Sequence, residues 1–182
     1  SELNKISSSI LKKLLEKNIF IEYEKEVYRT NDDERNLVSK YPLTSDQQKV
    51  VDTIMNSGEV PSTYLLHGVT GSGKTEVYME LIDRVLQKDK TAIMLVPEIS
   101  LTPQIVDRFI TRFGDSVAIL HSGLSDTERY DEYRKIMDGL VRIVVGARSA
   151  IFAPLKNLGL IIIDECQSST YKQENTPKYN AI

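Results

Sequence analysis

Residues 68–76 read GVTGSGKTE and follow the apolar stretch TYLLH at 63–67. Three glycines in six positions, then a lysine and a threonine, fit the pattern G-x-x-x-x-G-K-[ST]. In that pattern, backbone N–H groups and the positive end of the following helix form a cradle for phosphates. The stretch therefore predicts an anion-binding loop between a strand and a helix. A glycine-rich connection without a ligand is the weaker alternative, because the flanking pattern is the one the motif requires.

The lysine and the threonine that end this pattern have expected roles in binding a nucleotide. Lys74 is expected to contact the β- and γ-phosphates of a nucleotide, and the Thr75 hydroxyl is expected to ligate Mg²⁺. The predicted nucleotide-binding residues of the loop are Gly68, Thr70, Gly71, Ser72, Gly73, Lys74 and Thr75.

A phosphate-binding loop needs a second group that holds the metal, and residues 158–165, LGLIIIDE, supply a candidate. There an apolar strand pattern ends in Asp164 and Glu165. Asp164 is expected to hold Mg²⁺, and Glu165 is expected to orient and deprotonate the attacking water, so that Lys74, Asp164 and Glu165 form the predicted catalytic set. The alternative is that both acids merely solvate the end of a strand.

The rest of the pattern alternates short apolar runs with amphipathic helical stretches, which favours an α/β fold with a mainly parallel sheet between helical layers. Apolar stripes at helical spacing lie within 77–85 and 105–113, and capping boxes begin at Thr44 and Ser125. The expected strands are 63–67, 92–96, 117–120, 142–145 and 159–163.

Composition sets limits on function. With 41% hydrophobic and 27% charged residues and no apolar run near the roughly 18 residues of a membrane span, the 182-residue chain is typical of a soluble globular protein. A net charge of −3 excludes a general basic field, so contact with nucleic acid must be local. The single cysteine, Cys166, excludes an internal disulfide and is consistent with a reducing cytoplasm.

The polar run TNDDERN at 30–36 separates a differently patterned N-terminal region from the α/β region, which predicts a segment at 1–36 and a domain at 37–182. The first residue is Ser and the chain stops at PKYNAI, so we expect a piece of a longer protein.

From about residue 43 to 182, the chain resembles the replication-restart DNA helicases of the PriA type (primosomal protein N′), which belong to superfamily 2. The resemblance is carried by LLHGVTGSGKTEVY, LVPEISLTPQ, LHSGLSDTERYDE, IVVGARSAIFAPLKNLGLIIIDE and SSTYKQE. It implies the first RecA-like lobe of a P-loop helicase, truncated before the second lobe, with residues 1–36 as part of a winged-helix segment.

The resemblance also implies further site residues. Gln47, in LTSDQQ, would read adenine, although it is equally the third residue of a capping box. Ser100, Thr102, Arg148, Ser149, Tyr171 and Lys172 would contact DNA. From the residues alone, Ser100 and Thr102 could instead cap a helix, and Tyr171 could pack against the sheet. His67 and His121 are interpreted as structural.

The chain departs from the family where relatives carry Asp-Glu-Glu-His, because Cys166 and Gln167 follow Glu165. Gln167 would replace a histidine that couples nucleotide to DNA, so coupling is more in doubt than hydrolysis. Ala147 stands in GARSA where many relatives have threonine.

By resemblance, the complete protein would couple ATP hydrolysis to 3′-to-5′ unwinding of forked or single-stranded DNA in the bacterial cytoplasm, with primosome proteins and single-strand-binding protein as partners. The cofactors would be ATP and Mg²⁺, with zinc only in a region outside this sequence, and no membrane contact. This piece alone would be weakly active or inactive. The alternatives are another superfamily 2 translocase, a small-substrate phosphotransferase or a non-catalytic nucleotide-dependent adaptor.

Overall fold

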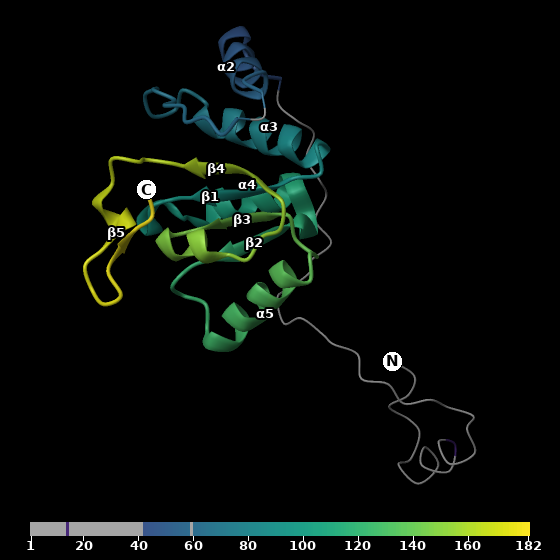
Figure 1. Ribbon diagram of the computed structural model, residues 1–182, viewed down its shortest axis with the longest axis vertical. Coiled ribbons are helices and arrows are strands. Elements are labelled where there is room, and N and C mark those ends of the chain that lie inside the picture. The colour runs from purple at the N-terminus through teal and green to yellow at the C-terminus, as the bar shows by residue number, and fades with distance from the viewer. Residues whose placement is uncertain (1–13, 15–41, 59) are drawn as a thin grey trace.

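A four-stranded parallel sheet lies at the centre of the computed structural model, which describes residues 14, 42–58 and 60–182 (Figure 1). Its strands run in the order β2-β3-β1-β4, and every neighbouring pair is parallel. The strands are β1 (Thr91–Leu95), β2 (Val117–Leu120), β3 (Ile143–Gly146) and β4 (Leu158–Ile163). The predicted α/β class is confirmed. The winged-helix prediction for 1–36 falls outside the described residues, apart from Leu14.

Within residues 42–58 and 60–182, four α-helices accompany the sheet: α2 (Ser45–Met55), α3 (Lys74–Gln87), α4 (Pro103–Phe113) and α5 (Asp126–Met137). Capping boxes start α2 at Thr44 and α5 at Ser125, as predicted from the sequence. None of the helices in the described part of the chain is long and apolar enough to span a membrane.

Shorter elements follow the strand ends. They are the 3₁₀ helices η2 (Glu98–Ser100), η3 (Gly114–Ser116), η4 (Arg148–Phe152) and η5 (Ser169–Tyr171), and a hairpin of β5 (Lys172–Gln173) and β6 (Tyr179–Asn180).

Alternating side chains of β1 divide the core into two layers, because successive residues of a strand point to opposite faces of the sheet. Ala92 and Met94 pack with α3 and α4, whereas Ile93 and Leu95 pack with α5, η4 and η5. Helix α2 lies outside the first layer and buries Val51 against α3. The two inner strands, β1 and β3, are buried along their whole length.

The predicted strand at 63–67 does not form. Residues 61–69 have no regular secondary structure; Leu66 packs against the core, whereas Leu65 is 80% exposed. A strand requires a neighbouring backbone, and none in the described chain pairs with this segment.

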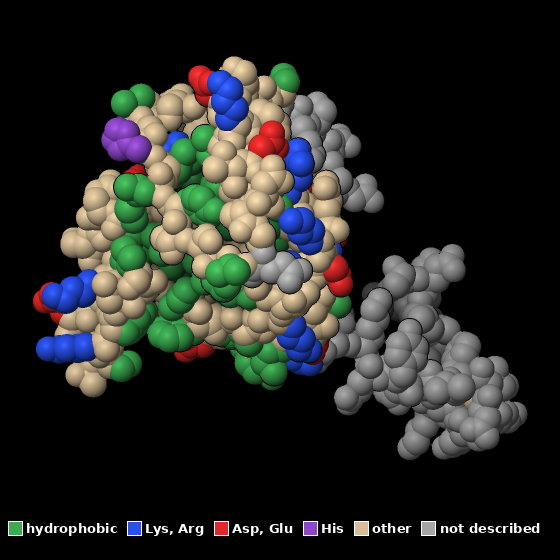
Figure 2. Space-filling model, turned by 45° about the horizontal axis from the view of Figure 1, so that its top comes forward, with side chains coloured by type: hydrophobic (Ala, Val, Ile, Leu, Met, Phe, Trp, Pro, Cys, Tyr) green, Lys and Arg blue, Asp and Glu red, His purple; other side chains and the backbone are tan. Residues whose placement is uncertain are grey.

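The edge strand β4 carries two exposed apolar side chains, Leu158 and Ile161. Figure 2 shows hydrophobic side chains gathered on one face of the molecule.

Candidate nucleotide-binding site

The loop at 68–75 has the backbone conformation that the glycine pattern predicts. Gly71 and Gly73 both have φ near +80° (79° and 80°), a region that residues with a Cβ seldom adopt. Gly73 is the N-cap of α3 and provides no side-chain cap. In the described contacts the amides of Lys74 and Thr75 have no acceptor, whereas the Glu76 amide donates to Gly73 O at 3.1 Å. The first two amides of α3 are therefore open to another acceptor, at the positive end of the helix dipole.

Lys74 is folded back over this loop. Its Nζ donates to the carbonyl oxygens of Gly68 at 2.8 Å and Val69 at 3.0 Å. The ammonium group is thus held within the cradle by neutral acceptors, and a phosphate would offer it a stronger, charged one.

Gln47 joins α2 to the same loop. Its Oε1 accepts from the Thr44 amide at 2.9 Å, which completes the capping box, while its Nε2 donates to the carbonyl oxygens of Gly73 at 3.3 Å and Ser72 at 3.5 Å. A Cβ on Gly73 would collide with that Nε2. The capping role is therefore present, and the amide also contacts the loop.

Asp164 follows β4, and its backbone amide extends the sheet by donating to Leu95 O at 2.9 Å. Its carboxylate Oδ1 accepts from the Tyr78 hydroxyl at 3.1 Å and from the Glu165 amide at 3.1 Å. Burial raises the pKa of Tyr78, and the Asp164 carboxylate raises it further, so that this phenol remains a donor.

Glu165 adopts a strained backbone next to this carboxylate. Its φ is 48°, in the left-handed region that costs energy for a residue with a Cβ. The side chain is exposed, and its Oε1 accepts from the Ser100 hydroxyl at 3.2 Å. The turn therefore directs a carboxylate outward from the end of the sheet, with Ser100 as its partner.

Thr75 and Asp164 provide the oxygen ligands that Mg²⁺ prefers, a hydroxyl and a carboxylate. Tyr78 lies one helical turn after Thr75, and its bond to Asp164 places that carboxylate beside the same face of α3. This arrangement fits a magnesium ion bound jointly with a phosphate. Within the described residues, no cluster of three or more His, Cys, Asp or Glu side chains forms an all-protein metal site.

Arg148 and Tyr171, both predicted to contact DNA, are engaged inside the protein. Arg148 donates to the carbonyl oxygens of Thr170 at 3.2 Å and Lys172 at 2.8 Å, and to Gln173 Oε1 at 2.7 Å. Tyr171 is 1% exposed, and its hydroxyl donates to Asp164 O at 2.5 Å and Leu95 O at 3.2 Å. A buried ring has no free face for a base, so in this conformation Tyr171 packs on the sheet, the alternative raised from the sequence.

The remaining predicted DNA residues differ in exposure. Thr102 caps α4 by accepting from the Ile105 amide at 3.5 Å, the other role considered from sequence. Ser149 is exposed, and so is Lys172, which lies 3.6 Å from Glu174. Gln167 and Cys166 are exposed in the turn after Glu165. Of these residues, Ser149 and Lys172 are the predicted DNA contacts that are exposed. The described contacts show no role for their side chains in holding the fold.

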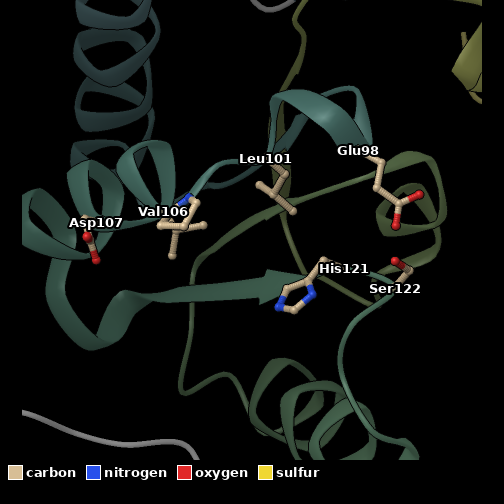
Figure 3. Close-up of a pocket in the computed structure, with 7 residues that line it drawn as sticks. Glu98, Leu101, Val106, Asp107, His121 and Ser122 are labelled. Atoms are coloured by element: carbon tan, nitrogen blue, oxygen red, sulfur yellow. The ribbon is translucent and has the colours of Figure 1, made fainter.

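A hollow of about 440 Å³ lies where the segments after β1 and β2 meet (Figure 3). In Figure 3, His121 lies between Val106 on one side and Glu98 and Ser122 on the other, with Leu101 above it. The His121 Nδ1 accepts from the Gly123 amide at 3.1 Å, which fits its structural interpretation. Carboxylates of Glu98 and Asp107 line the hollow, and negative charge makes it a poor phosphate site.

Tyr78 is the site residue that sequence reasoning missed. It belongs to the apolar stripe of α3 and is 7% exposed, so its ring reads as core. The sequence held one indication of this role: Tyr78 has a hydroxyl and lies three residues after Thr75, so both residues share one face of α3.

Taken with these contacts, the sheet and loop define a P-loop lobe of the helicase type. The chain belongs to the DEAD/DEAH box helicase family, whose family model matches residues 44–182. Membership implies the use of ATP.

Within that family the similarity is to proteins named replication restart protein PriA. The chain is 53% identical over 179 residues to the one from Bacillus subtilis (strain 168), which covers 96% of this chain and 22% of the relative. Identity to the Synechocystis protein (strain ATCC 27184 / PCC 6803 / Kazusa) is 46% over 177 residues, covering 96% and 21%. For the Treponema pallidum (strain Nichols) protein it is 49% over 141 residues, covering 78% and 21%. The chain spans about a fifth of the length of these relatives.

Proposed function

We propose that this chain is the ATP-binding motor lobe of a replication-restart DNA helicase, which in its full-length form couples ATP hydrolysis to 3′-to-5′ movement on DNA. The observation that carries the proposal is the uncapped start of α3 at Gly73, on the same helix whose Tyr78 bonds to Asp164 at the end of β4. Similarity to the PriA proteins supports the choice of DNA as the partner.

The loop residues do most of the binding in this proposal. The amides between Gly68 and Thr75 receive the phosphates, and Lys74 exchanges two carbonyl acceptors for charged phosphate oxygens. Thr75 and Asp164 would hold Mg²⁺, which neutralises phosphate charge when bound. Gln47 already contacts the loop through its amide, and adenine would compete for the same donor.

Glu165 is the proposed base. Its exposed carboxylate orients the attacking water and takes its proton. The Ser100 hydroxyl bonds to this carboxylate, so a DNA phosphate that draws Ser100 away would free Glu165 for water. This contact offers a direct connection between DNA and hydrolysis that does not pass through Gln167.

The DNA path in this proposal uses the exposed Ser149 and Lys172 together with the half-buried Ser100, whose hydroxyl bonds to Glu165. Arg148 and Tyr171 contribute by holding the 170–173 segment in place. Primosome proteins and single-strand-binding protein as partners, action in the bacterial cytoplasm, and zinc outside the described region remain proposals that rest on resemblance alone.

The test is ATP hydrolysis by the full-length protein with and without single-stranded DNA. We expect DNA to stimulate turnover and Glu165→Gln to abolish it while nucleotide binding persists. Stimulation by a small phosphate acceptor instead of DNA would indicate a phosphotransferase. Tight ATP binding with no turnover under either condition would indicate a nucleotide-dependent adaptor, and both results would overturn the motor proposal.

A further inference from the structure

Two buried tyrosines from opposite faces of the sheet both donate hydrogen bonds to Asp164. Tyr78, on α3, donates to the carboxylate Oδ1 at 3.1 Å. Tyr171, on η5, donates to the backbone carbonyl oxygen of the same residue at 2.5 Å. Tyr78 thus contacts the charged carboxylate of Asp164, whereas Tyr171 contacts its backbone.

The two oxygens of the Asp164 carboxylate are not equivalent. Oδ1 accepts from both the Tyr78 hydroxyl and the Glu165 amide, each at 3.1 Å. Across residues 42–58 and 60–182, no group is found donating to Oδ2. The paired donors fix the rotation of the carboxylate about its final bond and leave Oδ2 available to another ligand.

Tyr78 is well placed to control that rotation. Its ring is packed among Met79, Ile82 and the β1 side chains, so that the hydroxyl has little freedom to move. It lies at the third position after Thr75 on α3, and residues at this spacing share a helix face. The same face therefore carries the proposed magnesium hydroxyl and the donor that orients the magnesium carboxylate.

We propose that Tyr78 is a positioning residue that orients the Asp164 carboxylate for magnesium and thereby sets the magnesium concentration at which nucleotide binding tightens. The inference rests on the proposed nucleotide site and assigns it a residue outside the phosphate-loop and Asp-Glu motifs. Partners that orient a metal-holding carboxylate change metal affinity by about 10-fold to 100-fold when removed.

A merely structural tyrosine would make a different prediction. A buried phenol that only satisfies its own hydroxyl would affect the stability of the fold when changed to phenylalanine, with no dependence on magnesium. The quantity that distinguishes the two roles is the Mg²⁺ concentration at the midpoint of nucleotide binding. It is compared between two Tyr→Phe variants, each of which removes one hydroxyl that donates to Asp164.

The experiment uses full-length protein and a fluorescent ADP analogue, titrated in EDTA and then over a range of Mg²⁺ concentrations. For Tyr78→Phe we expect unchanged affinity in EDTA and a magnesium midpoint raised about 10-fold. Tyr171→Phe is the matched control, and we expect its midpoint to stay within about twofold of the wild-type value. Retained binding in EDTA shows that each variant is folded.

A midpoint for Tyr78→Phe that is unchanged, lowered, or raised equally in Tyr171→Phe overturns the inference. Failure of the wild-type protein to bind the analogue under any condition overturns the nucleotide site itself. The two failures are distinguishable because the first leaves binding in EDTA intact.

Discussion

The phosphate loop and the predicted DNA-contact residues illustrate two ways in which a motif can be built. In the loop at 68–75, the groups proposed to bind the ligand are backbone amides, and Gly73 provides no side-chain cap at the start of α3. Among the predicted DNA residues, Arg148, Tyr171 and Thr102 use their side chains to hold the protein's own backbone. The comparison shows that backbone sites can be read from glycine spacing, whereas long side chains serve whichever partner packing brings nearest.

The largest effect is expected at the loop. Lys74→Ala removes the only side-chain cation that the described contacts place within the cradle, and we expect nucleotide affinity to fall about 100-fold, because bonds to charged groups are strong. Titration calorimetry measures the loss. Lys88→Ala, at the exposed far end of the same helix, is the control and should bind normally. Equal binding by both variants would remove the basis for the comparison.

The next largest effect is expected for Arg148, one of the predicted DNA-contact residues. Arg148→Ala should lower the free energy of unfolding by about 1–3 kcal/mol, because two carbonyl oxygens lose a charged donor. Urea unfolding measures this change. The control is Arg129→Ala on α5, whose ion pair with Asp126 is long at 3.7 Å and should contribute under about 0.5 kcal/mol. If Arg148→Ala left stability unchanged but weakened DNA binding, Arg148 would instead be assigned to contact with DNA, as predicted from the sequence.

Gln47 lies between these two cases, because its side chain both caps α2 and contacts the phosphate loop. Gln47→Glu keeps an acceptor for the Thr44 amide but removes the donor to Gly73 O. We expect α2 to remain formed and nucleotide affinity to fall about fivefold, the effect of one hydrogen bond. Circular dichroism and nucleotide titration measure the two outcomes separately. Gln48→Glu changes a side chain bonded only to Asp52 in the described contacts and should leave nucleotide affinity unaltered; a matching loss there would discredit the assignment.

The smallest effect is expected for Lys172, which is exposed near the hairpin. Lys172→Ala should change stability by less than about 0.5 kcal/mol. If it contacts a phosphate, DNA affinity should fall modestly and the salt dependence of binding should lose about one unit of slope. Fluorescence anisotropy at several salt concentrations tests this. Lys156→Ala, just before β4 at the opposite edge of the sheet, should not alter the slope; an equal change would mean general charge attraction.

Much of the fold was predictable because local signals agreed with one another. Short apolar runs at β1 to β4 and the apolar stripes of α3 and α4 predicted elements close to their observed bounds. Residues 63–67 carried the same apolar signal, yet they have no strand partner in the described chain. Hydrophobicity indicates that a segment is suited to a sheet, but pairing depends on a second segment that the local pattern does not contain.

The site shows the same division. The left-handed glycine conformations of the loop at 68–75 and the place of Asp164 at the end of β4 were predictable from the motif pattern, whereas the binding roles of these residues stay predictions. The burial of Tyr171 and the role of Tyr78 were not, since each depends on which atoms meet across the sheet. The sequence contained both options for Tyr171, and only packing selected between them.

The central claim is that the open amides of the phosphate loop, with Lys74, bind the phosphate tail of a nucleotide. Titration calorimetry of the folded full-length protein with magnesium ADP tests it most directly. We predict saturable heat for the wild-type protein and an affinity about 100-fold weaker for Lys74→Ala. No heat from the wild-type protein at millimolar nucleotide would contradict the claim.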